Sequence, residues 1–392
     1  MSRRVVPIGP YHPLQEEPEF FKLFVEGEKV VGLEINIGYN HRAHEFVSMR
    51  KTFDQVTFLV ERICGICSDS HPFAYVNAVE DLAGIEIPER AKYIRTIVGE
   101  LERIHSHYLW VGLAGHFIGY NTVWMWVWRY REPLLDLCEL ICGNRNHYAI
   151  NKIGGVRRDI REEDYPAIEK VLNELEDKTL MFTNAILDDP VMRARLEGVG
   201  ILTKEQAIAY SVVGPTARGS GVAIDVRKDD PYAAYDLIPW DLIVFEEGDV
   251  LAKAKVRLLE CLESIKIIRG CLEKMPKGEI QVRIDEIPRG EGIGRHEAPR
   301  GEVFHYVRSD GGKSPCRHKV RAPSYNNIPS NEVAVLGYSI ADAALVLAAV
   351  DPCYCCTERT VVVQDGRIIG QGRDLLERSW AKTERLRERF KR

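Results

Sequence analysis

The stretch Arg62-Ile63-Cys64-Gly65-Ile66-Cys67 and the distant stretch Asp351-Pro352-Cys353-Tyr354-Cys355-Cys356 each contain two cysteines with two residues between them. A single C-x-x-C pair is common to redox dithiols and zinc knuckles, but two pairs in one chain indicate a site of four thiolates. In a zinc ribbon the two pairs lie about 15–20 residues apart. Here most of the chain separates them, so a shared site has to join the two ends of the chain and lie in the core of the fold.

The ligand chemistry limits the metal that such a site could hold. Thiolates are soft ligands that suit zinc, nickel, copper(I) or iron–sulfur chemistry, whereas hard cations prefer oxygen. A structural zinc ion fills all four positions, while a catalytic metal needs an open position and polar groups nearby. Polar residues flank both pairs: Glu61, Arg62, Asp69 and His71 at the first, and Asp351, Glu358 and Arg359 at the second. Their clustering favours a catalytic centre.

Other cysteines and a tryptophan-rich segment carry weaker signals. Cys355 is adjacent to Cys356 but falls outside the C-x-x-C register, so we expect it not to be a ligand. Trp124, Trp126 and Trp128 alternate with apolar residues, and we interpret them as buried packing. The remaining cysteines lack flanking polar residues of this kind, and we expect them to be small, buried and apolar in character. These cysteines are Cys138, Cys142, Cys261, Cys271 and Cys316.

Hydrophobic patterns predict the elements around the two pairs. Before the first pair, apolar runs at 21–25 and 30–37 flank a Glu-Gly-Glu turn and predict a hairpin. Residues 52–143 have helical periodicity, with apolar residues on one face of a long helix, and these are Ile94, Ile97, Leu101, Ile104 and Tyr108. Further helices are expected at 165–187, 203–210, 240–275 and 331–349, and strands with turns at 278–312.

These patterns predict the α+β class. Residues 1–50 form a β-rich N-terminal part, and residues 51–392 form a helix-dominated body that binds the metal, with further short strands near the C-terminus. No internal repeat or low-complexity linker is visible, so we expect one compact unit.

Composition excludes several classes of protein. Hydrophobic residues make up 45% of the 392 residues and charged residues 28%, which is typical of a globular chain and not of a disordered one. The net charge of -5 provides no general attraction to nucleic acid or anionic lipid. The N-terminus lacks the apolar core of a signal peptide, and no apolar stretch is long enough to span a bilayer. We therefore expect a soluble cytoplasmic chain that reaches a membrane only through partners.

The motifs together resemble a known family. Both cysteine segments resemble the large subunit of nickel-iron hydrogenases, specifically the energy-converting, membrane-bound branch related to the 49-kDa-type subunit of respiratory complex I. The resemblance extends over nearly the whole chain. Five further motifs stand in family order, and they are Gly9-Pro10-Tyr11-His12-Pro13, Gly38-Tyr39-Asn40-His41-Arg42, Gly154-Gly155-Val156-Arg157-Arg158-Asp159, Gly214-Pro215-Thr216-Ala217-Arg218-Gly219 and Glu297-Ala298-Pro299-Arg300-Gly301.

The resemblance implies a nickel–iron centre on four cysteines, with carbonyl and cyanide groups on iron. Matched residue by residue, Cys64 and Cys353 would be terminal nickel ligands, and Cys67 and Cys356 would bridge nickel and iron. A terminal thiolate beside an open metal position can take up the proton when H2 is cleaved, so Cys64 and Cys353 would also be catalytic.

Three more positions acquire roles from the resemblance. Arg300 would hang over the open metal position, where a guanidinium stabilises developing charge. Glu17 would relay protons from a terminal cysteine, and a buried thiolate nearby should raise its proton affinity. His41 stands where complex I relatives place a quinone-binding histidine, and in a hydrogenase it would serve the proton path or the contact with the membrane subunit.

The end of the chain departs from the classical pattern. Classical hydrogenases have a histidine three residues after the last ligand cysteine, near a divalent ion, whereas this chain has Arg359, as does the energy-converting branch. We expect a carboxylate such as Glu45 to neutralise Arg359. Many family members lose the following segment by proteolysis. Here residues 361–369 predict a hairpin, followed by a helix from about Asp374, so we expect the mature protein to keep this tail near a subunit interface.

The motifs leave three candidate functions: two kinds of redox subunit and a structural zinc scaffold. The first is the catalytic subunit of a ferredoxin-linked, ion-pumping hydrogenase that reduces protons to H2, with electrons from a small partner subunit whose 4Fe-4S cluster lies beside the metal. The alternative is a non-hydrogenase electron-transfer subunit of a complex I-like assembly that handles quinone or sulfur. The presence of all four ligand cysteines favours the first. A structural zinc scaffold fits the wide separation of the pairs poorly.

Overall fold

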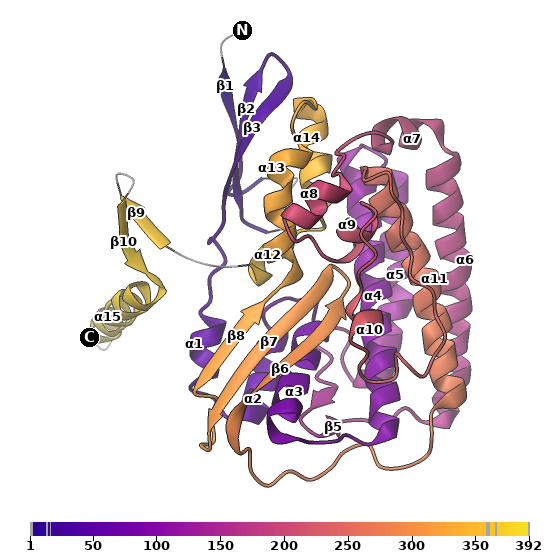
Figure 1. The fold of residues 1–392 in the computed structure, drawn as a ribbon, viewed down its shortest axis with the longest axis vertical. Coiled ribbons are helices and arrows are strands. Elements are labelled where there is room, and N and C mark those ends of the chain that lie inside the picture. The colour runs from indigo at the N-terminus through magenta and orange to yellow at the C-terminus, as the bar shows by residue number, and fades with distance from the viewer. Residues whose placement is uncertain (1–2, 13–14, 16, 358–360, 365–366, 391–392) are drawn as a thin grey trace.

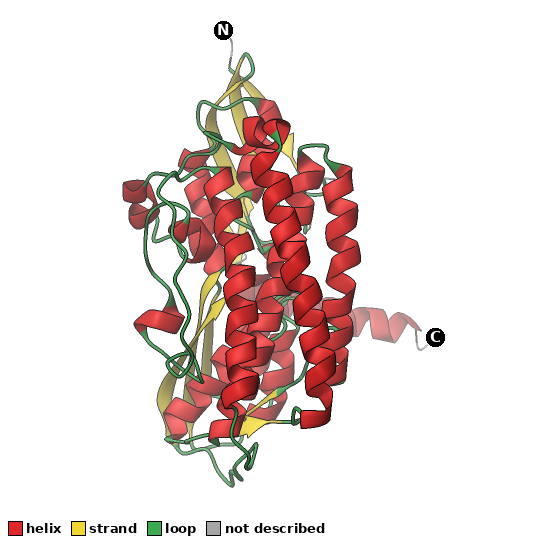
Figure 2. Cartoon of the chain, turned by 90° about the vertical axis from the view of Figure 1, so that its right-hand side faces the viewer, coloured by secondary structure: helices red, strands yellow, loops and turns green. Residues whose placement is uncertain are grey.

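The computed structural model describes residues 3–12, 15, 17–357, 361–364 and 367–390. Four long helices lie side by side and form most of the body (Figures 1 and 2). They are α4 (Glu89–Phe117), α5 (Asn121–Cys142), α6 (Tyr165–Asp188) and α11 (Val250–Lys274). The predicted apolar face of α4 is confirmed, since Leu101, Ile104 and Tyr108 are fully buried.

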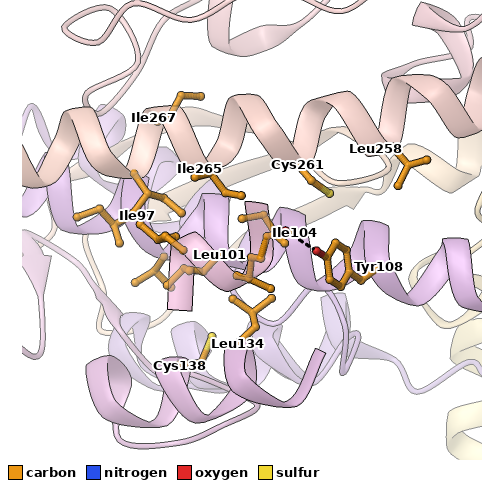
Figure 3. Packing of buried hydrophobic residues seen from close by; sticks show 14 of the residues in the cluster. Ile97, Leu101, Ile104, Tyr108, Leu134, Cys138, Leu258, Cys261, Ile265 and Ile267 are labelled. Atoms are coloured by element: carbon orange, nitrogen blue, oxygen red, sulfur yellow. Dashed lines mark hydrogen bonds between the residues drawn. The ribbon is translucent and has the colours of Figure 1, made fainter. Parts of the chain in front are cut away.

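The core of the helical layer is shown in Figure 3. Leu101 and Ile104 of α4 pack with Cys138 of α5 and Cys261 of α11 in one apolar cluster. The Tyr108 hydroxyl donates a hydrogen bond to the Leu175 carbonyl in α6 at 2.9 Å. Burial of this face therefore holds the helices together, and Cys138 and Cys261 act as the small apolar residues that were predicted.

An antiparallel sheet covers one side of the helical layer. It has the order β6-β7-β8, formed by β6 (Arg289–Ala298), β7 (Gly301–Asp310) and β8 (Arg317–Arg321). Helix α3 (Ser70–Ala83) lies on this sheet, and a Cβ atom at Gly294 would be 2.0 Å from the Ala74 carbonyl oxygen. Glycine in β6 is thus what lets α3, which directly follows the first cysteine pair, approach the strand backbone.

The N-terminal part is a second antiparallel sheet of order β1-β2-β3, formed by β1 (Arg4–Ile8), β2 (Phe20–Glu26) and β3 (Lys29–Asn36). The predicted hairpin is therefore confirmed, with Leu23 opposite Leu33. Strand β1 was not predicted separately, and residues 44–48 are helical in a part that we expected to be β-rich. The observed class is α+β, as predicted.

Short elements connect these layers. The helices among them are α1 (His44–Ser48), α2 (Phe53–Glu61), α7 (Pro190–Leu196), α8 (Lys204–Ala209), α9 (Gly214–Arg218), α10 (Val226–Asp229), α12 (Pro323–Asn327), α13 (Asn331–Ala334) and α14 (Ile340–Ala348). Two short strands and three 3₁₀ turns are also described, and they are β4 (Asn151–Lys152), β5 (Gly155–Val156), η1 (Glu162–Asp164), η2 (Ile328–Ser330) and η3 (Tyr354–Cys356).

Two predicted helices differ from the structure. The helix expected at 240–275 begins only at Val250, because Gly248 has a φ of 70° and the Asp249 side chain caps the helix by accepting from the Ala252 N–H at 2.7 Å. The helix expected at 331–349 is split into α13 and α14, because Gly337 between them has a φ of 83°. Left-handed glycines end helices that hydrophobic patterns alone would continue.

The expected burial of the tryptophan segment and of Cys316 is wrong. Trp126 is 43% exposed and Trp128 is 36% exposed, whereas Val123 and Val127 are buried. On a helix, residues four apart share a face, while residues two apart point to different sides, so alternate tryptophans cannot all face the core. Cys316 is exposed just before β8.

The described part of the tail has the predicted elements. Strands β9 (Val361–Gln364) and β10 (Arg367–Gln371) pair antiparallel, and α15 (Gly372–Phe390) follows. The tail stands beside the body on the side of α1 (Figure 1). The rings of Trp380 in α15 and Phe46 in α1 lie with their centroids 6.0 Å apart. Among the helices that the structure describes, none has both the length and the apolar run needed to cross a membrane.

Candidate metal centre

The two cysteine pairs meet in the interior. The first pair lies between α2 and α3, and the second lies at η3. The Sγ atom of Cys353 is 3.3 Å from that of Cys64 and 2.8 Å from that of Cys356. The Cys67 thiol is hydrogen bonded to Cys353 and Cys356, and the contact with Cys353 together with burial raises the pKa of Cys67 well above its ordinary value. The ends of the chain therefore converge as the spacing of the pairs required.

The C-x-x-C loop prepares Cys64 to be a thiolate. The backbone N–H groups of Ile66 and Cys67 each donate to Cys64 Sγ at 3.3 Å. The Cys353 thiol also donates to this sulfur, and it is the main cause that holds the pKa of Cys64 well below its ordinary value. Hydrogen bonds to the charged form favour it, and the thiolate is the form that binds metals.

Cys355 lies closer to the cluster than its register suggested. Its Sγ atom is 3.5 Å from Cys353 Sγ. The sulfur atoms of Cys64, Cys353, Cys355 and Cys356 all lie within 4.8 Å of one another. The centre thus contains a fifth thiol, and whether Cys355 stays outside the ligand set remains a prediction.

Arg300 places a charge at the sulfur atoms. Its Nη1 atom donates to Cys67 Sγ at 3.5 Å and to the Ser106 hydroxyl at 3.1 Å. Its Nη2 atom forms an ion pair with Asp351 at 2.7 Å, and Nε donates to the Asp351 carbonyl at 2.8 Å. Burial opposes the charge, but Asp351 and the cysteine sulfurs keep the pKa of Arg300 well above its ordinary value. The guanidinium is therefore a fixed, fully ionised group beside the thiols.

Close backbone packing positions Arg300. Gly214 has a φ of 69°, and a Cβ atom there would lie 2.3 Å from the Arg300 carbonyl oxygen. Asn327 donates to the same oxygen at 3.1 Å. The two sequence motifs that contain Gly214 and Arg300 are thus in direct contact. Glycine is required at position 214 because the two backbone segments touch there.

Glu17 lies at the edge of the centre. The backbone N–H of Cys355 donates to Glu17 Oε2 at 2.7 Å. Glu17 is half-buried in the segment that leads into β2, so a carboxylate from the N-terminal part reaches the second cysteine pair.

The loop before α1 contributes a residue whose role the sequence did not show. Arg42 donates to the carbonyls of Arg62 at 2.7 Å, Ile63 at 2.6 Å and Cys355 at 3.2 Å. It therefore ties both cysteine segments together. The neighbouring His41 is exposed. A signal was present, since Arg42 closes the motif at 38–42, but a loop arginine alone does not indicate which carbonyls it binds.

The structure describes some of the polar residues near the cysteine pairs and not others. Glu61 is buried and ion paired with Arg62, and burial raises its pKa to about 6. Glu45 accepts from the Val320 N–H at 3.1 Å and pairs with Lys319. Glu358 and Arg359 lie outside the described residues, so the pairing of Arg359 with Glu45 stays a prediction.

A buried network of ion pairs supports the motif at 297–301. Arg218 pairs with Glu260 at 2.7 Å and with Glu297 at 2.8 Å. Burial would raise the pKa of Glu100, but its pairs with Arg103 and Arg227 hold that pKa at about 2. These residues come from α4, α9, α10, α11 and β6, so no local sequence pattern could have identified them.

Comparisons with known proteins find similar sequences over nearly the whole chain. Residues 118–287 and 283–359 match the family model described as "Respiratory-chain NADH dehydrogenase, 49 Kd subunit", and residues 42–112 match the model described as "Nickel-dependent hydrogenase". The membrane-bound hydrogenase subunit alpha of Pyrococcus furiosus is 40% identical over 98% of this chain and 95% of its own length. The carbon monoxide-induced hydrogenase of Rhodospirillum rubrum is 38% identical over 92% of this chain and 100% of its own length.

A solved structure is also similar. A chain in the structure of the membrane-bound sulfane sulfur reductase, an archaeal respiratory membrane complex, superposes with a TM-score of 0.87. The two chains are 32% identical, and the match covers 91% of this chain and 98% of that chain. The chain is thus similar to proteins that are named as a hydrogenase, an NADH dehydrogenase and a sulfur reductase.

Proposed function

Because this chain belongs to the family that contains the large subunits of membrane-bound nickel-iron hydrogenases and the 49-kDa subunits of respiratory NADH dehydrogenases, we propose that it is the catalytic subunit of an energy-converting hydrogenase. It reduces protons to H2, reversibly, with electrons from a partner iron-sulfur subunit and ferredoxin, and this reaction is coupled to ion pumping. The resemblance inferred from the motifs is confirmed at the level of the family.

The observation that supports the proposal is the convergence of Cys64, Cys353 and Cys356. The Cys67 thiol is hydrogen bonded to Cys353, and the Arg300 guanidinium lies 3.5 Å from Cys67 Sγ. This donor set fits a nickel–iron centre, because the cluster is rich in soft sulfur and lies in a buried apolar environment. We propose that Cys64, Cys67, Cys353 and Cys356 would hold the nickel–iron centre, with carbonyl and cyanide groups on iron, and that Cys64 and Cys353 would be the catalytic ligands. When bound, the centre supplies an open metal position at which H2 is formed or split.

The protein groups around this centre would move and stabilise charge. The terminal thiolates of Cys64 and Cys353 hold a proton at sulfur. Glu17, hydrogen bonded to the backbone beside Cys353, passes this proton toward solvent. Arg300 is fixed by Asp351, so its positive charge stabilises the thiolates without rearrangement during turnover.

The proposal includes partners. An adjacent 4Fe-4S cluster would belong to a small iron-sulfur subunit, because the cysteines outside the centre are dispersed along this chain. Relatives are named as parts of membrane-bound complexes. We therefore place the chain as a peripheral subunit on the cytoplasmic side of a membrane, attached through ferredoxin-like and ion-pumping subunits.

A second candidate function rests on the similarity to the sulfane sulfur reductase structure and to the 49-kDa model. In this case the same site would handle sulfur or quinone in a complex I-like assembly, without nickel. The metal content of the purified complex separates the two functions.

Hydrogen evolution from reduced viologen by the purified complex tests the first function. Cys64→Ser and Cys353→Ser should each abolish activity, because a hydroxyl is a harder and weaker ligand for nickel than a thiolate. Cys355→Ser is the matched control and should retain activity, since its backbone N–H to Glu17 is unchanged. Retained activity in a Cys64 or Cys353 variant would remove that cysteine from the centre, and a large loss in Cys355→Ser would show that the ligand register is different.

A further inference from the structure

Three buried histidines form a continuous hydrogen-bonded chain behind the second cysteine pair. They come from different elements: His71 from α3, His305 from β7 and His318 from β8. His71 Nδ1 is 3.1 Å from His305 Nε2, and His305 Nδ1 is 3.0 Å from His318 Nε2. All three side chains are at most 1% exposed.

Both ends of this histidine chain have partners. At one end His71 Nε2 is 3.4 Å from the Sγ atom of Cys356. At the other end His318 Nδ1 is 2.9 Å from the Ser48 hydroxyl, at the end of α1. The Ser48 hydroxyl also lies 2.8 Å from the Glu45 carbonyl oxygen. The contacts thus run without a gap from the proposed metal centre to α1.

Other buried histidines contrast with these three. Within the described part of the protein, Nδ1 of His105, Nδ1 of His107 and Nε2 of His296 have no hydrogen-bond partner. In the histidine chain every ring nitrogen has one. All six ring nitrogens of the three histidines have hydrogen-bond partners, so the orientation of each ring is fixed.

The geometry of the links determines how the protons are arranged. All three rings are buried, and among the described residues none of their hydrogen-bond partners is a carboxylate, so the neutral imidazole is favoured over the charged one. A neutral imidazole has one N–H and one acceptor nitrogen. Because each link joins Nδ1 of one ring to Nε2 of the next, all three rings must carry the proton on the same type of nitrogen.

We propose that His305, His318 and Ser48 are positioning residues that act through His71 on the sulfur of Cys356. This inference rests on the proposed function in one respect, namely that Cys356 is a thiolate ligand. A thiolate only accepts hydrogen bonds, so His71 must then donate from Nε2. His305 and His318 carry their protons on Nε2 as well, and the Ser48 hydroxyl turns from the Glu45 carbonyl to donate to His318 Nδ1.

The arrangement has a chemical consequence. A hydrogen bond to a metal-bound sulfur withdraws electron density from the sulfur. A residue that bonds to a ligand can therefore change the electronic properties of the metal without touching it. Ser48 therefore influences Cys356 although three rings separate them.

Serine variants of the metal-loaded complex test the inference. Ser48→Ala removes the terminal hydroxyl, Ser48→Thr restores it, and Ser220→Ala is the matched control, because buried Ser220 also donates to a backbone carbonyl, at 3.0 Å, but lies outside the histidine chain. The readouts are nickel content, the infrared bands of the carbonyl and cyanide groups, and H2 evolution.

We expect Ser48→Ala to keep its nickel, to shift the infrared bands and to lose on the order of tenfold in activity. Ser48→Thr and Ser220→Ala should match the wild type. Unshifted bands in Ser48→Ala, or an equal shift in Ser220→Ala, would overturn the inference.

A second measurement does not depend on nickel or on the folding of a variant. Nitrogen NMR of the wild-type full chain, with ¹⁵N-labelled histidine, reports which nitrogen of each ring carries the proton. Nε2 should be protonated in His71, His305 and His318, and a proton on Nδ1 of any of the three rings would overturn the proposal. Absence of nickel from the wild-type complex would instead refute the proposed function, while the tautomers still decide the status of the histidine chain.

Discussion

Glu17 is the residue that we propose carries protons away from the cysteine centre. It lies beside the second cysteine pair through the 2.7 Å hydrogen bond from the Cys355 N–H. Glu17→Gln keeps an oxygen that can accept this bond but removes the exchangeable carboxyl proton. We expect H2 turnover to fall on the order of 100-fold with nickel content unchanged.

The control for this prediction is Glu28→Gln, which changes an exposed glutamate in the turn between β2 and β3. It should leave both activity and metal content at the wild-type level. Loss of nickel together with activity in Glu17→Gln would show that Glu17 is structural.

At this scale the sequence identified residues that act within recognisable motifs. Cys64 and Cys353 could be found from the spacing of their C-x-x-C pairs, and Arg300 from the resemblance of the motif at 297–301 to the family. His305 and His318 could not, because their partners lie on other elements and a histidine in a strand has no distinctive spacing. Three-dimensional contacts, and not local pattern, define such residues.

At the scale of elements, the contact between α9 and the loop before β7 holds Arg300. Gly214→Ala would place a Cβ atom 2.3 Å from the Arg300 carbonyl oxygen. We expect this variant to lose about 3 kcal/mol or more of stability, through strain at positive φ and the backbone clash, and to lose nickel.

Gly119→Ala is the control, because it introduces strain at a positive φ without the backbone clash of Gly214→Ala. Gly119 has a φ of 85°, and no described atom lies within 4 Å of a Cβ atom built there. The loss of stability in this variant should be only about 1–2 kcal/mol, from the left-handed conformation, with nickel retained. Urea midpoints and metal content measure both effects. Equal results for the two glycines would contradict the packing role of Gly214.

Helix α11 provides a pH-dependent prediction. Burial lowers the pKa of Lys253 to about 7, and its amine donates to the Gly200 carbonyl at 2.9 Å. Above pH 7 the unfolded state, in which the pKa of lysine is about 10.4, binds more protons than the folded state. Stability due to Lys253 therefore rises with pH from about 7 to about 10.

Lys253→Met removes this titration and keeps the length of the side chain. Between pH 7 and pH 9 the free energy of unfolding should rise by about 2 kcal/mol more in the wild type than in the variant. Urea unfolding at each pH measures this difference. The same pH dependence in both proteins would show that Lys253 is charged in the folded state.

Helix boundaries and helix faces were the less predictable part of the fold. The periodicity of residues 94–108 correctly identified the buried face of α4. The tryptophans at 124, 126 and 128 were assigned to the core because they alternate with apolar residues, although their spacing places them on different sides of α5. Burial depends on which neighbours cover a helix, and this information is not local.

At the scale of the whole molecule, the tail is in contact with the body. The Trp380 ring of α15 lies near Phe46, and the Arg50 guanidinium lies 3.6 Å from the centroid of the Phe46 ring and 5.5 Å from that of Trp380. We predict that mature, nickel-loaded enzyme retains residues 360–392. The intact mass of active enzyme should include this segment, and a mass that ends at Arg359 would refute retention.

Two cysteine pairs that lie far apart in the sequence form the centre. The C-x-x-C pairs predicted this convergence, because two half-sites need each other to complete four ligands. The identity of the metal and the reaction are not contained in the fold, since related chains are named for different chemistries.

The central claim is that the converging cysteines hold nickel and iron. Elemental analysis of the purified complex tests it most directly, with Cys67→Ser as the variant and Cys138→Ser, a buried cysteine outside the centre, as its control. The wild type and Cys138→Ser should contain about one nickel per chain and about one iron beyond the partner clusters, and Cys67→Ser should lose both. Zinc alone in the wild-type chain, or full nickel in Cys67→Ser, would contradict the account.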